Sequence, residues 1–308
     1  MKHLLYASLL TAAVFPAQQC TDASEQRAIP ANTTEKKPAP QAISLSNGFS
    51  DYWYAGKAEI CSYDVTQERY GEIRAAEQVN IFVTEDFSST KQVKLDDAAA
   101  AGQDRVPVLK LNLLRSFNTG IYDYAIMQSV FTPISGQPTL KSTCSVQDWC
   151  GQVFLQHNLE SNEYRSRGFS YFESEGDQDI KLPICLLEDE LWSRVRLNPA
   201  AIPTGNLRVI PSAIYTRLRH KPETAQNAAL SLEKGDLESV LKLVYADIPR
   251  ELRIRFETNF PHKILGWEET NESKLVSKGI LKASRMSAYW GENDNSHLPL
   301  RDSLKLGF

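Results

Sequence analysis

The stretch VPVLKLNLLRSFNTGIYDYAIM, residues 106–127, decides the fold class. Its first half alternates, because Leu109, Leu111 and Leu113 fall on one side of an extended chain and polar residues fall between them. An Asn-Thr-Gly turn (118–120) follows, and residues that favour strands resume directly after it. This pattern predicts two antiparallel strands joined by a hairpin.

The same two-residue period extends along most of the chain after residue 50. In AEQVNIFVTED (76–86), Val79 and Ile81 share one face while Phe82 lies on the other, as in a strand covered on both sides. Further strands are predicted over 139–146, 152–158, 164–173, 207–211, 214–220, 228–232, 237–245, 251–257, 263–269 and 278–290.

One helix is predicted in LLEDELWSRVRLN (186–198). Leu187, Leu191 and Val195 recur every four residues, acidic residues come early and arginines come late, as the helix dipole favours. Pro199 ends the pattern. Because this helix separates two β-rich stretches, we expect it to close one end of a barrel or to bridge two half-sheets near 186–203.

These patterns predict a mainly β fold over a single domain, residues 46–308. We expect a large curved antiparallel sheet, either an open barrel or a sandwich, with one or two short helices. The 308 residues include 34 Lys+Arg and 38 Asp+Glu, and this net charge of −4 argues against a nucleic-acid binder. No alternation of strands with long helices is present, which argues against a Rossmann or TIM architecture.

The first twenty residues are expected to form an export signal. Lys2 and His3 precede an apolar run of 12 residues (4–15), which is too short to span a membrane but suits a secretory signal. Residues 21–45 are rich in proline and polar residues, as in a flexible tether. We therefore expect an exported protein of the periplasm.

Cys20 is the candidate lipid-attachment site, which would tether the protein to the outer membrane. Ala17 and Gln19 occupy the −3 and −1 positions, where a standard lipobox has leucine and a small residue, so ordinary cleavage and a soluble secreted protein are the alternative. Without Cys20 an even number of cysteines remains, which favours disulfides in an oxidising compartment. The candidates are Cys61, Cys144, Cys150 and Cys185.

The four cysteines permit three pairings, one of which joins Cys144 to Cys150 across a hairpin and leaves Cys61 with Cys185. Buried free thiols are the alternative. The chain has no CxxC motif and no two histidines four residues apart, so we expect no metal site and no cofactor.

No motif of a known catalytic class is present, and no catalytic residue is assigned. The nearest candidate is His262 with Glu268 or Glu269, but a straight strand would separate His262 from Glu268 by about 20 Å. A histidine in a turn is the alternative.

Two groups of residues are candidate ligand contacts. If the strands over 214–220 and 251–257 were neighbours, their guanidinium groups would share a face and bind an anionic head group. These candidates are Arg217, Arg219, Arg253 and Arg255, with an ordinary solvated face as the alternative. Aromatic residues such as Tyr122 and Tyr124 are expected on the concave side of the sheet, or in the core.

Three segments resemble a family of uncharacterised exported proteins of Bacteroidota: YWYAGKAEI (52–60), FPHKILGWEE (260–269) and PLRDSL (299–304). Members of that family often carry the label "septum formation inhibitor Maf". The chain lacks the Ser-x-Ser-Pro-Arg-Arg loop of the Maf nucleotide pyrophosphatases, so their activity is not expected here. The strand pattern also resembles the curved sheets of periplasmic lipoprotein carriers, which implies a hydrophobic cleft.

The sequence therefore favours a non-enzymatic cell-envelope protein. We expect it to bind a lipid-like ligand or an envelope partner through the concave face of its sheet. The alternatives are an exported hydrolase and a structural or assembly lipoprotein without a small ligand.

Overall fold

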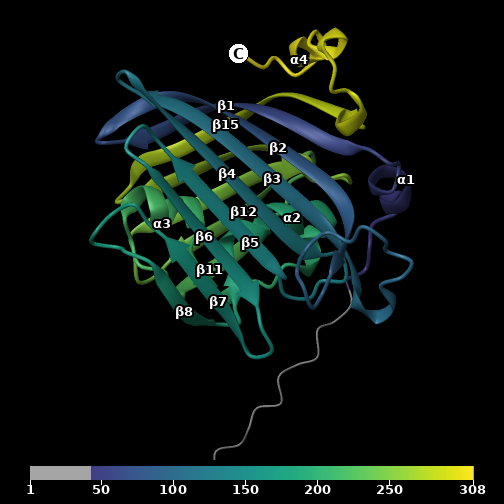
Figure 1. The fold of residues 1–308 in the computed structure, drawn as a ribbon, viewed down its shortest axis with the longest axis horizontal. Helices are drawn as coiled ribbons and strands as arrows, with labels where there is room; N and C mark the ends of the chain where they lie inside the picture. The colour runs from purple at the N-terminus through teal and green to yellow at the C-terminus, as the bar shows by residue number, and fades with distance from the viewer. Residues whose placement is uncertain (1–42, 308) are drawn as a thin grey trace, which may run out of the picture. The chain divides into compact units, whose positions relative to one another are not determined.

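The computed structural model describes residues 43–307, and these residues build one sheet of fifteen strands in the order β8-β7-β6-β5-β4-β3-β2-β1-β15-β14-β13-β12-β11-β10-β9 (Figure 1). Neighbouring strands run antiparallel except β9 and β10, which are parallel. The expected signal segment 1–20, with Cys20, and most of the expected tether lie outside the described residues. The expected mainly β fold with a large curved sheet is confirmed.

The strands are β1 (Ala58–Arg69), β2 (Glu72–Ser88), β3 (Arg105–Thr119), β4 (Tyr122–Pro133), β5 (Lys141–Gln147), β6 (Gln152–Leu159), β7 (Glu163–Phe169), β8 (Gln178–Pro183), β9 (Leu186–Leu187), β10 (Gly205–Ile210), β11 (Gln226–Glu233), β12 (Glu238–Tyr245), β13 (Arg250–Glu257), β14 (Ile264–Asn271) and β15 (Lys274–Ser287). The α-helices are α1 (Phe49–Trp53), α2 (Leu191–Leu197), α3 (Ala213–Arg219) and α4 (Leu300–Ser303). Short 3-10 turns are η1 (Gly102–Asp104), η2 (Glu188–Glu190), η3 (Pro199–Ala201), η4 (Tyr289–Gly291) and η5 (Asn295–His297).

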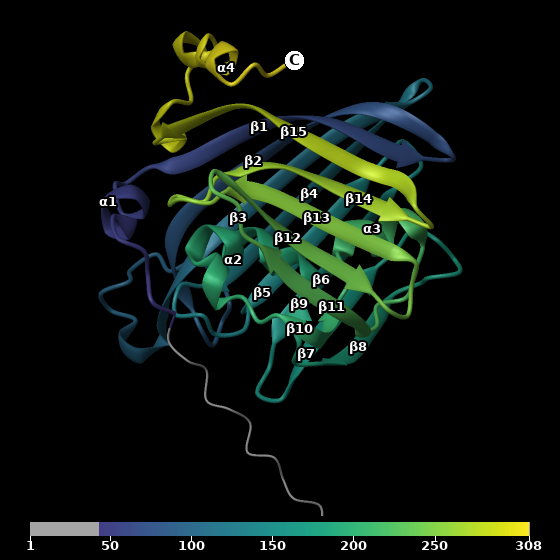
Figure 2. The same cartoon turned by 180° about the vertical axis from the view of Figure 1, so that it is seen from behind.

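The sheet curves until its two walls face each other. Strands β2 to β8 form the near wall in Figure 1, and β11 to β14 form the near wall when the molecule is turned round in Figure 2. Helices α2 and α3 lie between the walls, where α2 contacts β3 and β4 and α3 contacts β5. The two edge strands, β8 and β9, are separated by only two residues, and apolar side chains from both edge regions pack together there.

The alternation in the sequence explains which side of each strand is buried. Leu109, Leu111 and Leu113 of β3 point inward and are at most 1% exposed, as predicted. They belong to one apolar core that also contains Leu191 and Val195 of α2. The helix therefore fills the space that the curved sheet encloses. Of the helix predicted over 186–198, residues 188–197 are helical as η2 and α2, whereas Leu186 and Leu187 form the strand β9.

The strand predicted over 214–220 is wrong, because these residues form α3. Ser212 caps the helix by accepting a hydrogen bond from the Ile214 amide, and His220 ends it in the left-handed region at φ 51°. Ile214, Thr216 and Leu218 imitate a two-residue period, but residues four apart such as Ile214 and Leu218 also share one face of a helix. The local pattern fits both structures, and the N-cap favours the helix.

The predicted disulfides are wrong for the described residues, in which all four candidate cysteines are free. Cys61 is buried in β1 and Cys144 is buried in β5, whereas Cys150 is exposed in the turn after β5. Cys185 lies half-buried between β8 and β9. The thiols thus stand on separate elements, and the two inward-facing ones pack into the apolar core.

The C-terminal residues lie against the outer surface of the sheet. After β15 the chain passes through η4, η5 and α4, and the Ser62 hydroxyl of β1 donates a hydrogen bond to the Leu304 carbonyl. Leu304 is buried by this contact. In the part of the chain that the structure describes, no helix has the length and apolar character needed to cross a bilayer.

Candidate functional site

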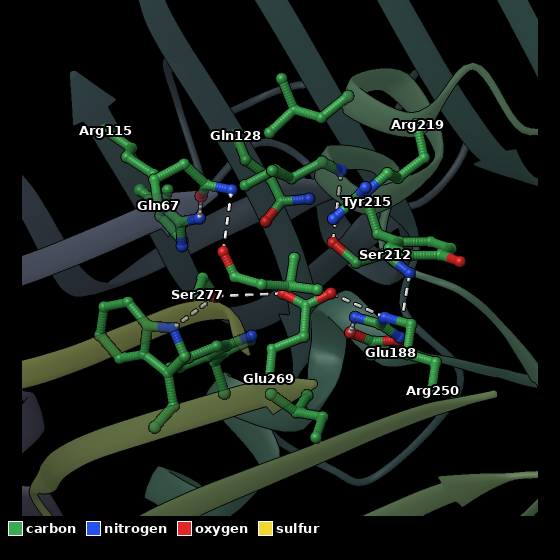
Figure 3. Close-up of a pocket in the computed structure, with 17 residues that line it drawn as sticks. Gln67, Arg115, Gln128, Glu188, Ser212, Tyr215, Arg219, Arg250, Glu269 and Ser277 are labelled. Atoms are coloured by element: carbon green, nitrogen blue, oxygen red, sulfur yellow. Dashed lines mark hydrogen bonds and ion pairs between the residues drawn. The ribbon is translucent and has the colours of Figure 1, made fainter. Parts of the chain in front are cut away.

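The interior between the two walls contains a polar centre rather than a purely apolar cleft (Figure 3). Arg250 of β13 is buried and donates hydrogen bonds to Glu188 of η2 at 2.6 Å and to Glu269 of β14 at 2.7 Å. Burial alone would lower the pKa of Arg250, but the two carboxylates raise it well above its usual value. Ser277 donates to Glu269 at 3.1 Å and accepts from the Trp267 indole at 3.1 Å.

Arg115 of β3 lies in the same centre and has amide partners instead of a carboxylate. Its guanidinium donates to the side-chain oxygens of Gln78 at 2.7 Å and of Gln67 at 2.6 Å. Burial lowers the pKa of Arg115 to about 10, so the group keeps its proton at neutral pH. The amides accept hydrogen bonds from the guanidinium, and the charge of Glu269 favours its protonated form.

The polar centre leaves almost no free space. The residues around Arg115, Arg250 and Glu269 enclose about 30 Å³, and a second interior hollow beside Arg69 and Tyr124 encloses about 20 Å³. Such volumes hold about one water molecule each. The expectation that a ligand occupies the concave face is therefore not supported, because α2, α3 and their ion pairs already fill that space.

A second buried ion pair connects α2 to the sheet. Arg196 donates to both carboxylate oxygens of Glu59, and the Tyr52 hydroxyl donates to the same carboxylate. Burial opposes ionisation of Glu59, but Arg196 outweighs it and lowers the pKa of Glu59 to about 2. The Cys61 thiol donates to Glu59 at 3.2 Å, and burial raises its pKa far above the usual value. This thiol is therefore a poor nucleophile.

Asp189 lies in η2 between the paired residues Glu188 and Glu190. Arg250 pairs with Glu188 and Arg194 pairs with Glu190, but none of the ion pairs in the described range 43–307 includes Asp189. Burial, together with the neighbouring charge of Glu188, raises the pKa of Asp189 to about 6. Asp189 is thus a buried carboxyl group without a cation.

The structure does not bring the four predicted arginines together. Arg217 and Arg219 lie on α3, where Arg217 donates to Glu175 at 2.9 Å and Arg219 pairs with Glu68 of β1. Arg253 and Arg255 lie on the outward face of β13, where each pairs with a glutamate. A shared head-group site for these four side chains therefore has no geometric basis.

Tyr122 and Tyr124 lie at the end of the barrel where β4 begins. Tyr124 is buried and accepts a hydrogen bond from Arg69 at 3.1 Å, whereas Tyr122 is half-buried. Their ring centroids are 5.9 Å apart. These tyrosines line the barrel rim instead of an open concave surface.

The predicted hydrolase pair is not assembled. His262 lies in the turn between β13 and β14, packs its ring edge-on against Phe260, and lies 3.3 Å from the Glu257 carbonyl oxygen. Burial lowers the pKa of His262. Glu268 faces outward beside Lys278 at 3.4 Å, and Glu269 faces inward to Arg250. Within residues 43–307, no group of three His, Cys, Asp or Glu side chains is placed to hold a metal ion.

A hollow of about 560 Å³ beside Trp53 and Trp290 is lined by six charged side chains, and two mainly apolar hollows lie on the outer surface of the sheet. One of about 300 Å³ runs beneath the C-terminal residues and is lined by Ile60, Val79, Ile81, Leu114 and the leucines of the C-terminal segment. A second of about 260 Å³ is lined by Glu77, Val79, Leu114, Met127 and polar residues of β5, among others. We call the two hollows together the outer groove, since they share Val79 and Leu114.

The sequence analysis did not identify this groove, although the sequence contains a signal for it. Val79 and Ile81 were recognised as apolar residues on the face opposite Phe82, which implies a cover on the outside of β2. Leu114 and Met127 extend the apolar surface across β3 and β4 and are 39% and 44% exposed. The cover itself comes from residues about 200 positions away, which no local pattern reveals.

Comparison with known proteins assigns the chain to no family. No protein-family model and no curated protein matches it. Among solved structures, it is similar to the crystal structure of a β-barrel-like protein of the domain of unknown function DUF1849 from Brucella abortus, with 9% identity and a TM-score of 0.47. That similarity covers 75% of this chain and 98% of the other. At these values it carries no functional argument, and the fold class rests on the strand order.

Proposed function

We propose that the protein is a non-enzymatic cell-envelope protein that binds a lipid-like chain in the outer groove. The observation that carries this proposal is the contrast in free volume. The interior hollows enclose about 30 and 20 Å³, whereas the two parts of the outer groove enclose about 300 and 260 Å³. Ligand pockets range from roughly 300 to 1,000 Å³ and are mostly apolar. The outer groove fits both properties, whereas the interior hollows are too small and the hollow of about 560 Å³ is lined by six charged side chains.

The lining of the groove suits an amphipathic ligand. Its middle is formed by apolar side chains of β1 to β4 and by Leu300, Leu304 and Leu306 of the C-terminal segment. Polar side chains, including Arg285, lie in the part beneath that segment. An acyl chain would cover the exposed leucine and methionine surface, with its polar end beside the arginine.

A structural or assembly protein without a small ligand is the second candidate. The specific observation in its favour is that the concave face is filled by the protein's own helices and ion pairs. Under this proposal the outer groove would remain empty of extractable lipid.

Native mass spectrometry separates the two candidates. The full chain, exported to the periplasm, is weighed before and after solvent extraction. We expect an extractable mass of lipid size, reduced in Leu114→Trp because the indole fills the groove. Ile280→Trp is the matched control, since Ile280 is 52% exposed and does not line the groove. A wild-type protein without extractable mass would reject the lipid proposal and favour the assembly protein.

A further inference from the structure

Large apolar side chains gather at one end of the barrel, on the turns of four hairpins. Strands β1 to β8 are paired in chain order, so the β1–β2, β3–β4, β5–β6 and β7–β8 connections all lie at the same end (Figure 1, left). Each connection bears one strongly exposed residue. Tyr70 is 59% exposed, Ile121 84%, Trp149 68% and Tyr171 62%. We call these four side chains the hairpin tips.

One of the hairpin tips, Tyr70, occupies a position where a turn favours a small polar residue. Tyr70 and Gly71 form the two-residue turn between β1 and β2, and Tyr70 has φ 56°. Asparagine, aspartate or glycine is favoured at such a position, and a bulky residue there is strained. The β14–β15 turn has the same length and places Glu272 and Ser273 at φ 52° and 61°. Strain of this kind is concentrated at functional sites.

The connections at the opposite end of the barrel differ in chemistry. The turn between β6 and β7 consists of Glu-Ser-Asn (160–162), and the turn between β11 and β12 begins with Lys-Gly-Asp (234–236). Leu237 of the β11–β12 turn is 81% exposed, and Val93 of the β2–β3 connection is 45% exposed. Within β1–β8, exposed large apolar residues are therefore present on every connection at the hairpin-tip end and on one of the three connections at the opposite end.

Aromatic contacts hold part of this end together. The Tyr70 hydroxyl lies 2.7 Å from the Tyr124 hydroxyl, and the guanidinium of Arg69 lies 4.3 Å above the Tyr70 ring. The Tyr122 ring links Tyr124 to Trp149, with centroid distances of 5.9 and 6.4 Å. Two of the hairpin tips are thus supported by a layer of half-buried and buried tyrosines.

We infer that the hairpin tips insert into the interface of a lipid bilayer. Tyrosine and tryptophan combine an apolar ring with a polar group and favour the boundary between water and lipid. The tips lie on four hairpin connections at one end of the barrel, so that their side chains can enter the same lipid interface.

Electrostatics do not drive this docking. The acidic residues Glu72, Asp123 and Asp148 lie close in sequence to three of the hairpin tips, and Arg219 and His220 at the end of α3 pair with Glu68 and Glu175, so the charge at this end is mixed rather than basic. Zwitterionic lipids are the expected partner. This inference does not depend on the outer groove, because none of the four tips lines it.

The test is flotation of the full chain with phosphatidylcholine vesicles, with Cys20→Ser in every sample to remove any lipid anchor. Trp149→Ser is expected to reduce vesicle partitioning about tenfold. The variant loses the free energy of binding that the indole gains when it leaves water for the lipid interface, which corresponds to at least that factor. Trp290→Ser is the matched control, because Trp290 is 52% exposed and lies on η4, outside the hairpin tips. Partitioning should persist at about 1 M salt, where the Debye length is about 3 Å.

Two results would overturn the inference. They are the absence of vesicle binding by the Cys20→Ser protein, and an equal loss in Trp149→Ser and Trp290→Ser. Far-ultraviolet circular dichroism confirms that each variant is folded. Leu114→Trp should leave partitioning unchanged, which distinguishes failure of this inference from failure of the groove proposal. A brominated lipid should quench Trp149, while Trp53, Trp192 and Trp267 are buried in the barrel.

Discussion

Replacement of Asp189 by asparagine should stabilise the protein above neutral pH. The Asp189 carboxyl group is buried and has no arginine or lysine partner among the described residues, while Glu188 beside it is charged and paired with Arg250. Burial and Glu188 raise the pKa of Asp189 from 3.8 to about 6, against hydrogen bonds from Ser212 and the Ala213 amide that favour the charged form.

The sign of the effect follows from this raised pKa. Below about pH 3.8 Asp189 is protonated in both the folded and the unfolded chain, so it does not affect the free energy of unfolding. As pH rises from 3.8 to 6 the unfolded chain loses the proton first, and the folded state becomes relatively less stable. Above pH 6 the penalty is complete and amounts to about 3 kcal/mol.

Asparagine removes that penalty because it cannot ionise, yet its side-chain oxygen still accepts from the Ala213 amide. We expect Asp189→Asn to raise the free energy of unfolding by up to about 3 kcal/mol at pH 8 and by little near pH 4.

Urea unfolding at several pH values measures this difference. Glu190→Gln is the matched control, because Glu190 lies 3.1 Å from Arg194 and its neutralisation should destabilise the protein at pH 8. The reasoning is refuted if Asp189→Asn is less stable than wild type at pH 8, or if its gain is the same at all pH values.

Three further outcomes are expected. Leu111→Ala should lower the free energy of unfolding by about 2–5 kcal/mol in urea, because it leaves a cavity in the core shared by the sheet and α2. Arg255→Ala should change the same quantity by less than about 1 kcal/mol, since its ion pair with a glutamate is largely exposed; a larger loss would contradict the outward placement. A thiol reagent should label Cys150 in the folded protein, and Cys61 and Cys144 only after unfolding. Labelling of all three in the folded protein would show that Cys61 and Cys144 are not buried.

Much of the fold was predictable because the alternation in the sequence is strong. The sequence also contains an indication of the polar centre that the predictions did not use. Arg115 follows Leu109, Leu111 and Leu113 at the same two-residue spacing, and Arg250 precedes Leu252 and Ile254 in the same way. An arginine at an inward position of a strand implies a buried charge, and hence a partner inside the barrel.

The identity of that partner was not predictable. Glu188 is 62 residues from Arg250, and the pair forms only because the helical segment is enclosed by the sheet. The edge strands β8 and β9 were also missed, because β8 is short and mixed in polarity and β9 has only two residues. Each depends on its neighbours for its conformation, so local sequence contains little information about it.

The strand order has a consequence for how the chain reaches its native state. Strands β1 and β15 are neighbours, and the pair Gln67–Ser277 joins residues 210 positions apart. Hairpins among β1 to β8 can form early because their partners are close in sequence. One edge of β1 nevertheless stays open until residues 274–287 arrive. A product truncated before that point would expose one unpaired edge of a twelve-residue strand, and such edges template aggregation. Pairing of the last strand therefore protects the chain from aggregation.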